Sequence, residues 1–155
     1  VFKRCIDDYH VNDDISQSPK NPYQKDQIEF LLYQKNWIDT VQWHLEDIIR
    51  DPEIDPSEAL KIKRTIDDSN QKRTDLVEYI DSYFLNEYKD IEPKDSATIN
   101  TESPAWALDR LAILTLKIYH MEEEATREDL ILEHEARERD PVGEGLRFHH
   151  SRKGF

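Results

Sequence analysis

Glycine is almost absent from this chain, and its few copies lie close together. Gly143, Gly145 and Gly154 are the only three, so residues 1–142 contain none. Tight hairpin turns and phosphate-binding loops depend on glycine, because other residues adopt the required backbone angles only at a cost. The body of the chain therefore lacks a Walker loop, a glycine-rich dinucleotide fingerprint and a Gly-x-Ser-x-Gly nucleophile turn. Long helices are the predicted alternative.

The chain also has only one cysteine, no long apolar run and no excess of positive charge. Cys5 is the only cysteine and cannot form a disulfide within the chain, and no apolar run approaches the roughly 20 residues of a membrane helix. The formal net charge is -13, which repels nucleic-acid phosphates and anionic membrane surfaces. The composition predicts a cytoplasmic protein whose partners include neither nucleic acid nor a membrane.

The spacing of apolar and helix-breaking residues predicts an all-α domain, a mostly antiparallel helical bundle with four main helices. Two starts stand out, because Asp55 and Ser103 are capping residues that each precede a proline. The single domain is expected to cover residues 1–140, and the tail at 141–155 is interpreted as flexible or non-native, with no site in it. The expected helices cover residues 1–10, 26–50, 55–88 and 103–139.

Polar residues interrupt the apolar stripe of the third predicted helix. Ser69 and Arg73 fall inside the stripe, and Asn70 lies at its edge. A buried arginine without a partner costs several kcal/mol, so Arg73 must meet a carboxylate, several carbonyls or a ligand. Asp109 on the fourth helix is the first candidate. Three interpretations stay open: a polar network that fixes helix register, a ligand or catalytic pocket, and a stripe that is partly exposed or wrongly phased.

The second predicted helix carries an aromatic residue on its polar side. Trp43 projects away from the main apolar stripe, among charged residues. Large apolar groups in such places often mark an interface, so we expect either a homo-oligomer contact at Trp43 or coverage by the loop at 91–102. His44 lies at the edge of the stripe, where a neutral core histidine is a more common outcome than a general base.

The fourth predicted helix is apolar nearly all round between Trp106 and Met121. This pattern predicts that its first half is the most buried element of the domain. Asp109 and Arg110 are polar exceptions in that half.

These polar residues could converge between helices, where bundle proteins usually build their sites. We predict a pocket for a small phosphorylated or carboxylated metabolite, with His44 and Asp109 as candidate proton-transfer residues. The alternative is an interaction or assembly protein whose buried polar network is only structural. The sequence indicates no cofactor, and no metal site is predicted because no histidine or cysteine motif has a recognised spacing. The candidate ligand-binding residues are Ser69, Asn70, Arg73 and Arg110.

A weaker alternative is a metal-dependent enzyme like the all-helical nucleotide pyrophosphohydrolases. Those enzymes hold magnesium with Glu-x-x-Glu and Glu-x-x-Asp motifs on adjacent helices, and Glu78 with Asp81 has the second form. Helical phase argues against this alternative, because Glu78 lies far from the apolar stripe of its helix.

Three segments carry a resemblance to a known family. They run from Trp43 to Pro52 (WHLEDIIRDP), from Asn70 to Arg73 (NQKR) and from Asn100 to Trp106 (NTESPAW). Together they resemble the helical bacterial family called domain of unknown function 4254, over about residues 6–139. The resemblance implies a fold class and a bacterial origin, and it implies no reaction.

Overall fold

The computed structural model describes residues 1–127, which fold into four α-helices and no strand. The predicted all-α bundle is therefore confirmed. The last part of the fourth predicted helix and the tail at 141–155 lie outside the described residues. The helices are α1 (Phe2–His10), α2 (Ile28–Ile49), α3 (Pro56–Glu87) and α4 (Pro104–Thr126).

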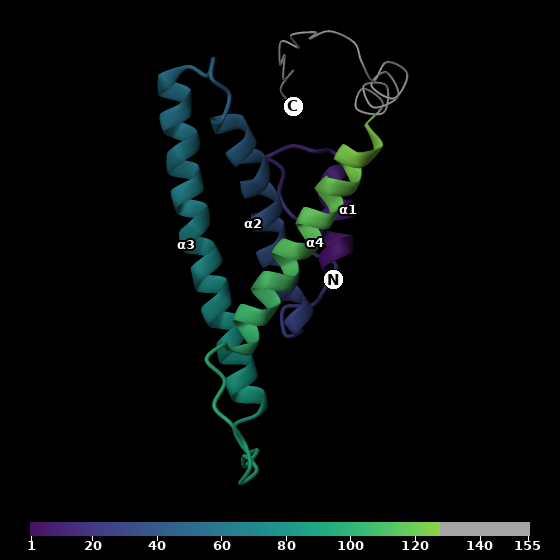
Figure 1. Ribbon diagram of the computed structural model, residues 1–155, viewed down its shortest axis with the longest axis vertical. Helices are drawn as coiled ribbons and strands as arrows, with labels where there is room; N and C mark the ends of the chain where they lie inside the picture. The colour runs from purple at the N-terminus through teal and green to yellow at the C-terminus, as the bar shows by residue number, and fades with distance from the viewer. Residues whose placement is uncertain (128–155) are drawn as a thin grey trace, which may run out of the picture.

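Helix α2 is the central element of the bundle. It contacts all three other helices, whereas α1 and α3 lie on opposite sides of it (Figure 1). Helix α3 runs antiparallel to α2, and α4 returns across both, reaching α1 near its own end (Figure 1). Among the described helices none is both long and apolar enough to cross a membrane.

The predicted caps of α3 and α4 are confirmed. The Asp55 side chain accepts hydrogen bonds from the backbone amides of Ser57 (2.9 Å) and Glu58 (3.1 Å). These amides lie in the first turn, where backbone N–H groups have no carbonyl partner within the helix. At the start of α4, Ser103 accepts from the Trp106 amide at 3.3 Å. Helix α4 ends at Thr126, and residues 128–139 of the predicted fourth helix lie outside the described residues.

At the end of α1 a residue other than glycine adopts a backbone conformation that glycine usually provides. Asp13 has a φ of 51°, and it is the only residue other than glycine with a positive φ in the part of the chain that the structure describes. Its amide donates to the Tyr9 carbonyl at 3.1 Å, a bond that ends the helix where glycine is most common. Aspartate is one of the few other residues that tolerate this conformation.

Two apolar clusters flank α2. On one side α1 and α2 enclose Cys5, Tyr9, Tyr33 and Trp37. On the other side Val77, Ile80 and Ala105 are buried against partly buried residues of α2, α3 and α4. Because α2 is covered on both sides, it is the helix that anchors the fold.

The prediction that the first half of the fourth helix is the most buried element is wrong. The buried residues of α4 are Ala105, Asp109, Ala112 and Leu116, which face the other helices. Several large apolar residues are exposed on the opposite side, which we call the α4 outer face. The reason is that α4 has neighbours on one side only, since the central position belongs to α2. The outer face carries Ala107, Leu111 (49% exposed), Leu114 (52%), Ile118 (47%) and Met121 (70%).

Candidate functional site

Four ionised side chains from three helices form a closed ring in the interior, which we call the charge ring. Its members are Lys35 and Asp39 of α2, Arg73 of α3 and Asp109 of α4. Lys35 Nζ lies 2.6 Å from Asp39 Oδ2 and also forms an ion pair with the Asp109 carboxylate. Arg73 closes the ring, with Nε 2.6 Å from Asp39 Oδ1 and Nη2 3.5 Å from Asp109 Oδ1.

The charge ring is balanced and deeply buried on its α2 side. The side chains of Lys35 and Asp39 are 2% and 3% exposed, and the ring holds two positive and two negative charges. Burial raises the pKa of Asp39, while the charges of Lys35 and Arg73 act in the opposite direction. No charge in the ring lacks an opposite charge, and its ion pairs join α2, α3 and α4.

A cavity of about 210 Å³ opens beside the charge ring. Arg73 connects the two, because its side chain is 24% exposed and also lines the cavity. Its Nη1 atom makes no hydrogen bond among the described residues. The cavity is lined by Asp39, Gln42, Trp43, Glu46, Arg50, Arg73, Ile113 and Leu116.

The structure brings some of the predicted site residues together and separates others. The expected contact between Arg73 and Asp109 is present. Asn70 accepts a hydrogen bond from Gln42 at 2.9 Å, so it lies near the cavity, and Ser69 is buried on the same helix. Arg110 instead forms an exposed ion pair with Glu102, away from the cavity lining.

Trp43 lies between the cavity and a second group of side chains. It lines the cavity, and its ring stacks on His120 of α4 with centroids 4.7 Å apart and planes 8° apart. The neighbour of Trp43 is therefore α4, not the loop at 91–102 that was considered as its cover. An interface at Trp43 stays a prediction.

The predicted proton-transfer residue His44 belongs to this second group, the histidine cluster of His10, His44 and His120. The three residues come from α1, α2 and α4, and one ring nitrogen of each lies within 4.8 Å of the others. Burial lowers the pKa of His44 and of His120, so the neutral form of both rings is favoured. Neither His44 nor Asp109 is among the residues that line the cavity, and the proton-transfer roles expected for them stay predictions.

The Glu-x-x-Asp motif has a structural role. Asp81 accepts hydrogen bonds from the Ser103 hydroxyl (2.8 Å) and from the Ala105 amide (3.2 Å), so it helps to cap α4. Glu78 is exposed. Within residues 1–127, the histidine cluster is the only group of three or more side chains placed to share a metal ion.

Sequence reasoning missed half of the charge ring. Lys35 and Asp39 lie on the side of α2 opposite Tyr33 and Trp37, which the sequence indicates to be the polar side of the helix. A lysine and an aspartate four residues apart resemble an ordinary surface pair. One signal could have indicated a second carboxylate such as Asp39. A buried guanidinium has five N–H donors, more than the carboxylate of Asp109 alone can accept hydrogen bonds from.

These features define a helical-bundle protein with a buried ionic core, and comparison with known proteins identifies its family. The family described as Protein of unknown function (DUF4254) matches residues 29–145. The chain belongs to this family, as its segments had suggested. No curated protein and no solved structure matches the chain significantly.

Proposed function

We propose that the cavity beside Arg73 binds a small metabolite with a phosphate or carboxylate group. One observation carries the proposal: the Arg73 guanidinium is held by two carboxylates, and its partly exposed side chain also lines the cavity. A guanidinium fixed in this way is pre-organised, so little side-chain entropy is lost when it binds an anion. A cytoplasmic location belongs to the same proposal.

The cavity lining supports a ligand with an anionic end and a less polar body. Arg50 supplies a second guanidinium, and Trp43 supplies a flat apolar wall. Glu46 and Gln42 are available for hydrogen-bond donors on the ligand. The volume of about 210 Å³ is below the roughly 300–1,000 Å³ of sites for drug-sized ligands, so the ligand is expected to be small.

In this proposal the residues behind the cavity position Arg73 and carry out no chemistry. Asp109 is occupied by Lys35 and Arg73, and it contributes no atom to the cavity lining. Asn70 holds Gln42 through its side-chain oxygen. The proposed activity is therefore binding, with the charge ring as its support.

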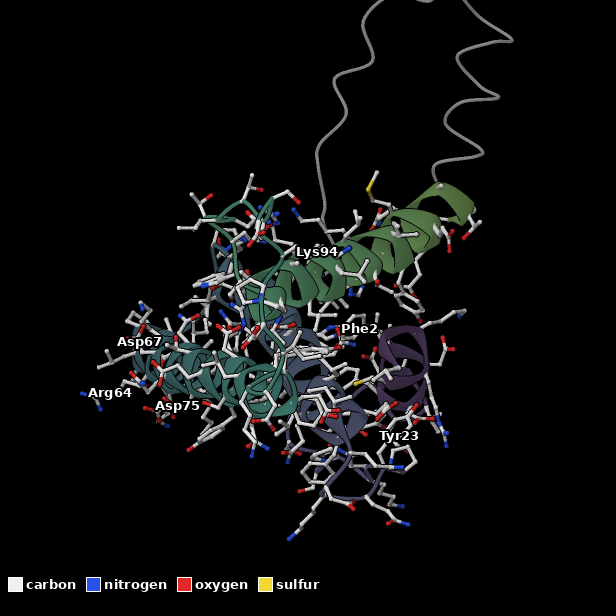
Figure 2. The ribbon with its side chains drawn as sticks, turned by 90° about the horizontal axis from the view of Figure 1, so that it is seen from below. Phe2, Tyr23, Arg64, Asp67, Asp75 and Lys94 are labelled. Carbon is white, nitrogen blue, oxygen red and sulfur yellow. The ribbon has the colours of Figure 1, made fainter. Side chains whose placement is uncertain are left out.

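A thermal-shift screen of phosphorylated and carboxylated metabolites tests the proposal. A compound present at 100 times its Kd should raise the Tm of the wild-type chain by about 5 °C or more. Arg50→Gln and Arg73→Lys should reduce the shift, because each weakens a guanidinium contact. Arg64→Gln is the matched control, since Arg64 projects from the outer side of α3 (Figure 2). The proposal fails if no compound raises the Tm, or if Arg50→Gln and Arg64→Gln give equal shifts.

The α4 outer face supports a second candidate function, self-assembly. Ala107, Leu111, Leu114, Ile118 and Met121 follow one another at alternating steps of four and three residues, the spacing of a coiled-coil seam. Four large apolar residues of α4 are exposed on this face, while two of the four buried residues on the inner face are alanines. An exposed apolar stripe of this kind is typical of a protein interface.

Charge along α4 favours a second copy of this chain, in antiparallel orientation, as the occupant. Arg110, Lys117 and Glu124 follow at seven-residue steps along one edge of the stripe, with the basic residues nearer the start of the helix. Two antiparallel copies would place the basic half of each helix beside the acidic half of the other. Such a pairing has twofold symmetry and closes at a dimer.

The mass in solution tests this second candidate. Sedimentation of the wild-type chain should give twice the 18.5 kDa of one chain, and the double variant Leu114→Glu/Ile118→Glu should give a single-chain mass. Leu85→Glu is the control, because Leu85 is 75% exposed on α3, away from the α4 outer face. A wild-type monomer, or a dimer unaffected by the double variant, contradicts the candidate.

A further inference from the structure

We propose that the histidine cluster is a binding site for a divalent transition-metal ion such as Zn²⁺. The Nε2 atoms of His10, His44 and His120 are all buried, and none has a hydrogen-bond partner. One ring nitrogen of each histidine lies within 4.8 Å of the others, although the residues are far apart in the sequence. Three converging imidazoles without partners are the usual protein contribution to a zinc site.

Hydrogen bonds set two of the rings in the form that binds metal. His10 Nδ1 donates to the Ile6 carbonyl at 2.7 Å, and His120 Nδ1 lies 3.1 Å from a Glu123 carboxylate oxygen, to which it donates. Because the proton is on Nδ1 in both rings, Nε2 carries the free lone pair. Metal-binding histidines usually donate their other nitrogen to a carbonyl or carboxylate in this way.

Each imidazole is also held by one aromatic ring. His10 stacks on Tyr119 with centroids 4.4 Å apart, and His44 stacks on Tyr9 at 5.1 Å. The third ring, His120, stacks on Trp43. These contacts limit rotation of the rings, so the three nitrogens are held near one another before any ion binds.

Asp13 lies beside one of the three histidines and is a candidate fourth ligand, although its carboxylate does not lie within 4.8 Å of all three nitrogens. Its Oδ1 atom lies 3.5 Å from His44 Nε2, at the residue with the positive φ that follows α1. Tetrahedral zinc with bonds of about 2.0–2.1 Å separates its ligand nitrogens by roughly 3.3 Å. The histidine nitrogens would therefore move inward by about 1 Å, and imidazole ligands suit Zn²⁺, Ni²⁺, Cu²⁺ and Co²⁺.

The test uses the full chain in a background that lacks its other three histidines. His134, His149 and His150 lie near the end of the sequence and can bind metal independently, so all three are replaced by glutamine. After treatment with a chelator and its removal, the background protein is titrated with Zn²⁺ by calorimetry and with Co²⁺ by absorption spectroscopy. We expect one ion per chain and the visible absorption bands of tetrahedral Co²⁺.

Single ligand variants then locate the ion. His44→Gln or His120→Gln should weaken Zn²⁺ binding by about 100-fold or more, because the loss of a residue that only hydrogen-bonds a metal ligand already weakens metal binding by about 10- to 100-fold. Gln71→Ala is a control at an exposed position of α3, which carries none of the three histidines, and it should bind Zn²⁺ as the background does. Circular dichroism confirms that each variant is folded.

The result on the background protein decides the proposal even if a variant fails to fold. Absence of stoichiometric Zn²⁺ binding there overturns it and leaves the histidine cluster as an apolar packing element. Binding that is unchanged in folded His44→Gln and His120→Gln overturns it as well. The titration uses no metabolite, so its outcome is independent of the cavity proposal.

Discussion

Removing one charge from the charge ring should be far more damaging than removing a balanced pair. Lys35→Met leaves Asp39 and Asp109 with Arg73 as their only cation, in a site where the lysine side chain is 2% exposed. Breaking a buried ion pair in this way costs about 3–5 kcal/mol. Asp39→Leu should cost a similar amount, because it leaves Lys35 and Arg73 to share Asp109.

The double variant Lys35→Met/Asp39→Leu restores electrical balance. Only Arg73 and Asp109 then remain charged, and apolar side chains of similar size replace the other pair. We expect the double variant to be less destabilised than the sum of the two single variants by about 2 kcal/mol or more. Urea unfolding followed by tryptophan fluorescence and circular dichroism gives the four free energies of unfolding.

A matched pair on the surface controls for the change in net charge. Lys63 and Asp67 form an ion pair with the same spacing on α3, with side chains 55% and 58% exposed. The same two substitutions there should give a coupling of about 0.5 kcal/mol or less. The reasoning is refuted if the changes at Lys35 and Asp39 are additive within about 0.5 kcal/mol, or if Lys35→Met costs less than about 1 kcal/mol.

Three further predictions concern single residues. The pKa of Asp55 is lowered because its side chain accepts hydrogen bonds, first from the Ser57 hydroxyl and then from two amides. Its stabilising contribution is therefore complete above the ordinary aspartate pKa of 3.8 and is lost as pH falls through the lower folded-state value. The stability difference between wild type and Asp55→Ala should shrink between pH 7 and pH 3, and an unchanged difference across that range would contradict the cap. Burial raises the pKa of Cys5 to about 12. A thiol reagent at pH 8 should therefore modify Cys5 only as fast as the protein unfolds. Immediate modification of the folded protein would refute the burial of Cys5. Asp81→Ala should lower the free energy of unfolding in urea by about 1–3 kcal/mol, because the start of α4 loses two hydrogen bonds. Glu78→Ala, at an exposed position, should change it by less than about 0.5 kcal/mol. Equal effects of the two variants would disprove the capping role.

The helices themselves could be predicted because their signals are local. Asp55 and Ser103 begin α3 and α4 where capping chemistry places them. The contact between Arg73 and Asp109 could also be expected, because a guanidinium on an apolar stripe requires a nearby carboxylate. Both the helix starts and the contact of Arg73 with a carboxylate follow from the chemistry of a few residues.

The surroundings of each helix could not be predicted in the same way. Apolar periodicity shows which face of a helix prefers burial, and it does not show how many neighbours the helix has. Helix α2 is covered on two sides, so Lys35 and Asp39 are buried despite their charge. The histidine cluster was missed for a related reason, since its three residues come from three helices and have no sequence spacing in common.

Because α3 is long, its amide hydrogens should be protected from exchange to different degrees in its first and second halves. None of its residues before Ile66 is buried, and this part lies beside α2 beyond the reach of α4 (Figure 1). The amide hydrogens of the part before Ile66 should therefore exchange with deuterated solvent through local opening. Those between Arg73 and Ile80 should exchange only when the whole domain unfolds. The first turns of α3 can open and close repeatedly without disturbing the ionic core.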